Sequence, residues 1–322
     1  MSKQDTSRSL IHTPADSAVE YVEYMRILRD TAGVKWGISQ IDNDMRPMRP
    51  GDVIGIIARP GHGKSTIAAY LTRKVAKDIV REGIDNEIAL YVTFEQSTEE
   101  IDTFFEIPDS EAYSLTDLSF GRIDESTLIK DSIKRISLPV FIMGESITRR
   151  KTMPRMTFDT IYSEIENIEE DYKVKPRIIV LDYIQIIPVD RKDDRVQQVG
   201  EAIVRSKELA RRVGCPVVVC VQAGRGVDKY EAKVPTAADC QWASAIEQAA
   251  DALIGIWRPA LTEQVGSHKT INGKDIEVTQ NLLIAKLLKQ RMASAGHVWF
   301  LNFAPQYVRL SDMELNHADI NG

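Results

Sequence analysis

The stretch "ARPGHGKST", residues 58–66, constrains this chain more than any other segment. It follows a β-branched run, "DVIGIIA", and precedes a helical pattern, "STIAAYLTRKVAKDIV". Gly61 and Gly63 allow successive backbone N–H groups to turn inward around phosphate oxygens, and the following helix directs its positive end at the same charge. Lys64 is placed to reach the β and γ phosphates, and Ser65 to bind Mg²⁺. The sequence therefore predicts a phosphate-binding loop between a strand and a helix.

Six residues of this segment are expected to bind the nucleotide, which we expect to be ATP with Mg²⁺. They are Gly61, His62, Gly63, Lys64, Ser65 and Thr66. Ala58 stands where such loops usually begin with glycine, but it closes the strand, where a methyl group is tolerated when φ is negative. His62 is the one loop residue to which the sequence assigns no role.

Short β-branched runs alternate with helical patterns along most of the chain. Strands are expected within 52–58, 88–95, 139–144, 177–187 and 215–223, and helices within 65–80, 97–107, 157–173 and 195–214. This alternation is typical of parallel β-α-β units with helices on both faces of a sheet. Adjacent strands joined by a turn are expected at 281–291 and 297–310. We predict an α/β fold with a mostly parallel central sheet flanked by helices, C-terminal antiparallel strands, and a mobile polar loop over 261–278.

The composition argues against membrane and secreted proteins. The chain has 322 residues, of which 43% are hydrophobic and 27% charged, as expected for one large globular domain with tails. No apolar run reaches about 18 residues, so no membrane span or secretion signal is expected. Three cysteines provide neither a disulfide framework nor zinc spacing, which suits the cytoplasm. The net charge of −6 argues against a uniformly basic coat for nucleic acid but is compatible with a local basic groove.

Two carboxylates follow predicted strands near the loop. Glu95 ends "YVTFE" and Asp182 ends "RIIVLD". Ligands of parallel sheets gather at the carboxyl ends of strands, so both carboxylates are expected beside the loop. Asp182 suits the metal, because after a continuous apolar run it would otherwise be an isolated charge. Glu95 either positions the attacking water or caps the helix near Ser97, although Ser97 and Glu100 already have capping-box spacing.

Polar residues also follow two later strands. Gln222 ends the strand 215–223, with Arg225 three residues further on, and either senses the γ-phosphate or is structural. Lys289 and Arg291 share one face of the strand 281–291, because positions i and i+2 point the same way. These two cations are either solvated or candidates for the arginine finger that stabilises charge on a transferring phosphoryl group.

An amphipathic helix is predicted over residues 13–30. Thr13 and Pro14 are typical of a helix start, and apolar residues then recur at three- and four-residue steps. The apolar face of this helix either covers its own domain or reaches a neighbouring subunit.

Taken together, these segments resemble the motor domain of DnaB-type replicative helicases, hexameric motors of the RecA-like class. The resemblance rests on "GDVIGIIARPGHGKST", "YVTFEQ", "IIVLDYIQII", "VQAGR", "SAIEQAADALI" and "IAKLLKQR", in the family's order, from about Trp36 to Leu310. "LDYIQII" is more particular to this family than the loop. The resemblance implies a tail and linker-type helix over 1–35, a RecA-like motor domain over 36–310 and a C-terminal tail over 311–322.

The resemblance also implies a role for each candidate residue within one chain. ATP and Mg²⁺ are bound by Lys64 and Ser65, the metal is supported by Asp182, water is activated by Glu95, and the γ-phosphate is sensed by Gln222.

A site shared between subunits is implied as well. By resemblance, Lys289 and Arg291 act in trans on ATP bound by the adjacent subunit. The active form is then a homo-oligomer, in this family a hexameric ring around single-stranded DNA, in a bacterial cell or a phage-infected host.

The sequence departs from the family in three places. The helical N-terminal domain that meets primase is not expected in this chain, although the helix at 13–30 resembles in position the linker helix that docks on a neighbour. Gln241 and Trp242 stand where the family often has an arginine for the DNA backbone. With Arg225 they are the candidate DNA-binding residues, and Trp242 either stacks on DNA or packs in an interface. The basic segment 149–155 is either a phosphate-contacting patch or an exposed loop.

Two functions stay open at this point. The first is an ATP-driven translocase or helicase on single-stranded DNA, 5′–3′ by resemblance, with a primase or helicase loader as candidate partner. The alternative is a RecA-like ATPase that acts as a loader, regulator or recombination accessory without unwinding. A small-molecule kinase explains the loop but not the strand of Lys289 and Arg291.

Overall fold

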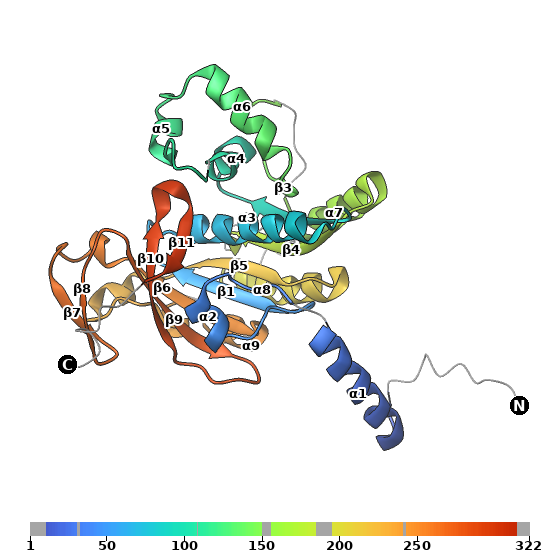
Figure 1. The fold of residues 1–322 in the computed structure, drawn as a ribbon. Helices are drawn as coiled ribbons and strands as arrows, with labels where there is room; N and C mark the ends of the chain where they lie inside the picture. The colour runs from blue at the N-terminus through green and yellow to red at the C-terminus, as the bar shows by residue number, and fades with distance from the viewer. Residues whose placement is uncertain are drawn as a thin grey trace, which may run out of the picture. The chain divides into compact units, whose positions relative to one another are not determined.

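The computed structural model describes residues 11–30, 33–107, 109–149, 156–184, 195–240 and 243–313. The chain divides into two compact units, residues 1–33 and 34–322. The first unit contains α1 (Pro14–Asp30), which confirms the predicted helix (Figure 1). Thr13 and Asp16 cap it, because the hydroxyl of Thr13 accepts from the N–H of Asp16 while the carboxylate accepts from the N–H of Thr13.

A nine-stranded sheet forms the centre of the second unit, in the order β11-β10-β9-β6-β1-β5-β4-β2-β3 (Figure 1). Its parallel strands are β1 (Val53–Ala58), β2 (Glu87–Thr93), β3 (Val140–Met143), β4 (Lys175–Asp182), β5 (Val217–Gln222) and β6 (Ala252–Trp257). The antiparallel strands β9 (Leu282–Gln290), β10 (Val298–Ala304) and β11 (Arg309–Asp312) extend it beyond β6. The predicted fold class is therefore confirmed.

Apolar side chains cover both faces of the sheet. Along β1, Ile54 and Ile56 belong to one core, and Val53 and Ile57 belong to the other, because strand side chains alternate between faces. The first core includes α3 (Lys64–Glu82), and the second includes α7 (Phe158–Tyr172) and α8 (Arg195–Val213). Burial on both faces explains why β1 reads as a continuous apolar run.

The remaining helices are short and connect the strands. They are α2 (Ser39–Asp44), α4 (Thr98–Glu106), α5 (Leu115–Ser119), α6 (Glu125–Arg135) and α9 (Ala243–Ala249), with 3₁₀ turns at Arg225–Lys229, Ala237–Asp239, Pro259–Leu261 and Pro305–Tyr307. Between β2 and β3, α4, α5 and α6 form a small lobe above α3 in Figure 1. No helix of the described ranges is long and apolar enough to cross a bilayer.

The prediction of a mobile polar loop over 261–278 is wrong. The segment contains a hairpin of β7 (His268–Ile271) and β8 (Lys274–Glu277). Asn272 and Gly273 turn it with φ of 53° and 75°, the conformation that Asn-Gly favours in two-residue hairpins. Ile271 and Ile276 are buried in a third apolar cluster that includes Trp257. The Asn-Gly pair in "INGK" is the sequence feature that indicates this hairpin turn.

Candidate nucleotide site

The phosphate-binding loop connects β1 to α3, as predicted. Gly61 and Gly63 have φ of 79° and 91°, which only glycine adopts without strain. Gly63 is the N-cap residue of α3, so the positive end of that helix faces the loop. A Cβ atom at Gly63 would lie 2.5 Å from the ring of Phe303 on β10, whereas one at Gly61 would meet nothing within 4 Å. The loop therefore needs Gly63 for packing as well as for conformation.

Lys64 and Asp182 form a buried ion pair beside this loop. Lys64 Nζ lies 2.6 Å from Asp182 Oδ1, and the Tyr91 hydroxyl donates to Asp182 Oδ2 at 2.6 Å. The Ser65 hydroxyl also favours the charged form of this carboxylate. Burial favours the neutral acid, but Lys64 and the hydroxyl donors outweigh it and hold the pKa of Asp182 below its usual value. Asp182 is therefore an ionised carboxylate.

The oxygen atoms of Ser65 and Asp182 suit Mg²⁺. This ion is commonly held by one or two protein oxygens together with substrate phosphates and waters, so it needs no cage of carboxylates. Within the described ranges there is no group of three or more His, Cys, Asp or Glu that could hold a metal ion by itself. The donor set therefore fits a metal that arrives with the nucleotide.

Glu95 lies in the connection between β2 and α4, at the carboxyl edge of the sheet. Its side chain is exposed and lines a cavity of about 540 Å³ between this connection and the residues after β3. The backbone places it near the ion pair, because Thr93 pairs with Asp182 in the sheet and the N–H of Phe94 donates to the carbonyl of Asp182. Ser97 caps α4, because its side chain accepts from the N–H of Glu100 and its N–H donates to the carboxylate of Glu100. The helix cap is therefore supplied without Glu95.

Gln222 ends β5 at the same edge. In the sheet it pairs with Ala58, the residue that leads into the loop, and its side chain is exposed. Arg225 begins the 3₁₀ turn that follows and is exposed as well. The structure thus brings Glu95, Asp182 and Gln222 to the edge that carries the loop.

Lys289 and Arg291 lie at the opposite edge of the sheet, where the parallel strands β1 and β6 begin. Strand β6 runs parallel to β1, and β9 runs back along β6 from Ile284, opposite Trp257, to Gln290, opposite Ala252. The two edges are about 16 Å apart along β1 at a strand rise of about 3.3 Å per residue. Neither cation therefore reaches the loop of its own chain.

Both cations contact the end of α9. Lys289 Nζ donates to the carbonyl groups of Glu247 and Ala250, the latter at 2.7 Å. Arg291 lies one residue beyond β9, donates to the carbonyl of Gln248 at 3.1 Å, and has Asp251 Oδ1 at 3.4 Å. They satisfy carbonyl groups at the helix end, a structural role that the sequence pattern did not suggest.

His62 and Tyr91 make contacts that the sequence did not predict. His62 is 7% exposed, and its Nδ1 accepts the backbone N–H of Arg258, just after β6, at 3.0 Å. Tyr91 lies on β2 and orients the Asp182 carboxylate. Thr66 is buried within the first turn of α3. Nothing in the sequence signals these contacts, because their partners lie more than 90 residues away.

Several predicted residues lie outside the described ranges. These are Gln241, Trp242 and residues 150–155 of the basic segment. Arg149 is described and exposed, and its N–H donates to the hydroxyl of Ser146.

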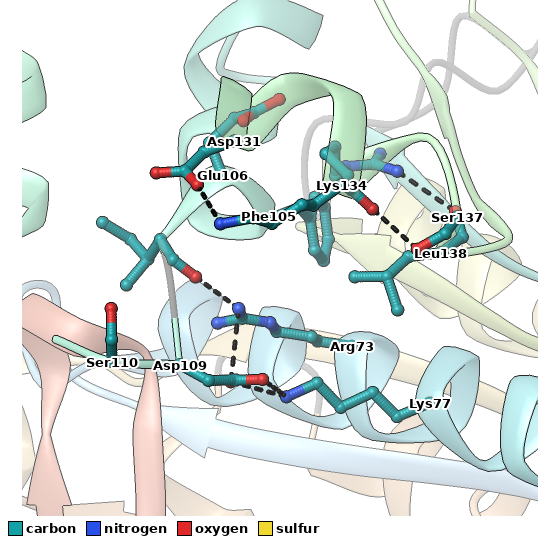
Figure 2. Close-up of a pocket in the computed structure, with 12 residues that line it drawn as sticks. Arg73, Lys77, Phe105, Glu106, Asp109, Ser110, Asp131, Lys134, Ser137 and Leu138 are labelled. Atoms are coloured by element: carbon teal, nitrogen blue, oxygen red, sulfur yellow. Dashed lines mark hydrogen bonds and ion pairs between the residues drawn. The ribbon is translucent and has the colours of Figure 1, made fainter. Parts of the chain in front are cut away.

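A separate pocket of about 330 Å³ lies between α3, α4 and α6 (Figure 2). Lys77 pairs with Asp109 at 2.6 Å, and Lys134 pairs with Asp131 at 2.6 Å. Arg73 donates to the carbonyl of Ile107 and also faces Asp109. Arg73 follows Lys64 by nine residues of α3, about 13 Å along a helix. The pocket is thus remote from the loop, and acidic groups or carbonyls already pair these cations.

The strand order and the loop between β1 and α3 define a phosphate-loop NTPase of the RecA-like class. The family model of the DnaB-like helicase C terminal domain matches residues 33–312. The chain therefore belongs to the DnaB-like helicase C-terminal domain family.

Known relatives agree with this assignment. Replicative DNA helicase DnaB of Rickettsia bellii (strain RML369-C) is 25% identical over 303 residues, covering 88% of this chain and 58% of the relative. Replicative DNA helicase DnaC of Bacillus subtilis (strain 168) is 22% identical over 292 residues, covering 90% and 59%. The chain thus spans less than two thirds of the length of these curated relatives.

Solved structures share the fold. One of them, described as an ATPase domain, matches with a TM-score of 0.74 at 19% identity, covering 94% of this chain and 100% of that one. A DnaB-like replicative helicase, described with its interactions with primase, matches with a TM-score of 0.73 at 18% identity, covering 92% and 67%.

Proposed function

We propose that this protein is an ATP-driven translocase and helicase on single-stranded DNA, with 5′–3′ polarity by family resemblance, that hydrolyses ATP at the interfaces of a ring. The observation that carries the proposal is the separation of two sets of residues. Lys64, Ser65 and Asp182 lie at one edge of the sheet, and Lys289 and Arg291 lie at the other. A ring in which each chain presents one edge to the opposite edge of its neighbour completes the site.

Within one chain, the loop binds the phosphates and Lys64 moves from Asp182 to them. The ammonium exchanges one buried anion for another, so its charge stays compensated throughout. Mg²⁺, held by Ser65 and Asp182, neutralises charge on the phosphate oxygens when it is bound. Asp182 keeps the hydrogen bond from Tyr91, which fixes the orientation of its carboxylate.

Glu95 and Gln222 act on the γ-phosphate side. Glu95 is exposed beside a cavity with room for water and orients the attacking water as a general base. Gln222 ends β5, the strand next to β1, and contacts the γ-phosphate, so that its position differs between ATP and ADP states.

The neighbouring chain supplies Lys289 and Arg291. Both exchange carbonyl partners at the end of α9 for the oxygens of the transferring phosphoryl group. Because this contact exists only across an interface, hydrolysis depends on assembly, and each turnover changes one interface of the ring.

The helix α1 holds neighbouring chains together in this proposal and is the linker helix before the motor domain. The expected end of that domain at 310 divides β11 (Arg309–Asp312), which pairs with β10, so the domain includes all of β11. Its apolar residues Val19, Tyr21 and Val22 are 72%, 61% and 50% exposed. A stripe of Ile129, Ile133 and Ile136 on and just after α6 is 55%, 63% and 80% exposed. Each surface is apolar and open to water, so docking of α1 on the α6 stripe of a neighbour buries both.

Single-stranded DNA passes through the ring and contacts Arg225, Gln241 and Trp242. Arg225 lies three residues after Gln222, the last residue of β5, so DNA contact and γ-phosphate contact share one short segment. A primase or helicase loader is a candidate partner, because a structural neighbour is described with its interactions with primase. We place this activity in the cytoplasm of a bacterial or phage-infected cell.

The rate of ATP turnover with and without single-stranded DNA tests the proposal. Stimulation of at least about tenfold by single-stranded DNA is expected if the DNA-contacting segment after β5 responds to the strand. Double-stranded DNA and RNA of the same length serve as comparisons. Turnover that is indifferent to every nucleic acid contradicts the proposal and favours a loader or regulator.

A further inference from the structure

His62 is the loop residue that the proposed function leaves unused. It lies between Gly61 and Gly63, is nearly fully buried, and contacts neither Lys64 nor Asp182 by hydrogen bond among the described residues. Its imidazole instead points to the residue after β6. Nδ1 accepts the backbone N–H of Arg258 at 3.0 Å, joining two segments 196 residues apart.

The charge state of the His62 imidazole suits this contact. Burial, followed by the nearby charges of Arg258 and Arg59, lowers the pKa of His62 to about 4, although Asp228 acts in the opposite direction. The imidazole is therefore neutral at pH 7, with its proton on Nε2 and a lone pair free on Nδ1. Two contacts hold the Arg59 side chain: it pairs with Asp228 at 3.2 Å and donates to the carbonyl of Ala223.

The end of β6, to which His62 is hydrogen-bonded, is more rigid than the loop. All six residues of β6 are buried, and β6 pairs with β1 on one side and β9 on the other. The loop contains two glycines, which lose more conformational freedom than other residues when they become ordered. A hydrogen bond from such a loop to a buried strand end orders the loop in advance. The loop then loses less conformational entropy when phosphates bind.

We propose that His62 is a positioning residue that holds the phosphate-binding loop against the end of β6 in the conformation that receives the phosphates. The proposal rests on the proposed function, since it concerns ATP binding by this loop. The imidazole acts through the loop backbone and needs no contact with the nucleotide. The packing of Gly63 against Phe303 holds the loop from a second side.

Replacing His62 by Leu and by Asn tests this role. In His62→Leu a methyl group takes the place of Nδ1, so the N–H of Arg258 loses its acceptor; in His62→Asn, Oδ1 takes that place and the acceptor remains. We expect His62→Leu to raise KM for ATP about fivefold, the effect of one hydrogen bond, with kcat within about twofold of wild type. His62→Asn should restore KM to within about twofold of wild type.

Two further measurements separate positioning from a general structural effect. Inorganic tripolyphosphate, used as a competitor, should lose affinity in His62→Leu by the same factor as ATP, because the loop receives phosphates. Ser206→Ala, which removes a buried hydrogen bond within α8, controls for lost stability and should leave KM unchanged.

Each result has one meaning. An unchanged KM in His62→Leu, equal losses in the Leu and Asn variants, or a loss confined to ATP and absent for tripolyphosphate overturns the role of His62. Failure of the wild-type protein to bind ATP overturns the proposed function instead, which the wild-type arm shows before any variant is compared.

Discussion

Lys64 Nζ lies 2.6 Å from Asp182 Oδ1, inside a site where Asp182 is 4% exposed. The pair compensates two buried charges while no nucleotide is present. In the proposed function ATP binding separates this pair, so the affinity for ATP and the stability of the free protein are expected to depend on the same two side chains.

Lys64→Met should destabilise the free protein and abolish ATP binding. Removing one partner of a buried pair leaves the other uncompensated, at a cost of about 3 kcal/mol in the free energy of unfolding. Urea denaturation measures this cost. The double variant Lys64→Met with Asp182→Asn should recover most of the stability, since the Asn side chain can still accept from Tyr91, but no ATP binding. Equal stability of all the variants would show that the pair contributes nothing.

Glu95→Gln should separate binding from chemistry. The amide cannot accept a proton from water, so kcat is expected to fall by at least about 100-fold while the affinity for ATP is retained. Glu145→Gln is the matched control, because Glu145 lines the same cavity and is also exposed. Near-normal turnover in Glu95→Gln would reject Glu95 as the base.

Two glycine variants should separate backbone strain from packing. Gly61→Ala introduces backbone strain alone, because no atom lies within 4 Å of the new methyl group. This strain should lower the free energy of unfolding by about 1 kcal/mol. Gly63→Ala adds a clash with the ring of Phe303 and should cost about 1–3 kcal/mol more. Chemical denaturation of both variants measures the difference. A cost for Gly63→Ala no larger than that for Gly61→Ala would contradict the close contact with Phe303.

Arg291→Ala should impair hydrolysis without impairing ATP binding. An arginine finger contributes about 10³-fold or more to phosphoryl transfer, and the phosphates are bound by a different chain. Arg309→Ala, which removes an exposed arginine paired with Glu111, is the control. If Arg291 serves only the end of α9, turnover per folded protein should match that of the control.

The sequence predicted elements whose signals are local. The β1–loop–α3 unit, the parallel sheet and the strands β9 and β10 follow from apolar runs, glycine spacing and alternation, and the structure confirms them. The Ser97 capping box was also visible as a spacing of three residues. The hairpin β7–β8 was missed because its polar residues outnumber its two buried isoleucines, although Asn272 and Gly273 marked the turn.

Contacts between distant segments could not be predicted. The partner of His62 depends on where β6 ends in space, and the partner of Tyr91 depends on β2 lying beside β4. The sequence placed Lys289 and Arg291 together, but only the direction of β9 shows that they lie at the edge away from the loop. The catalytic roles stay predictions until the variants are measured.

Complementation between two inactive variants tests the shared site most directly. Glu95→Gln keeps Arg291 but cannot activate water, and Arg291→Ala keeps Glu95 but lacks the finger. In rings mixed at equal amounts, about a quarter of the interfaces combine an intact Glu95 from one chain with an intact Arg291 from its neighbour. ATP turnover of the mixture is expected to rise well above that of either variant alone. Turnover of the mixture equal to the average of the two variants would contradict a site completed by a neighbouring chain.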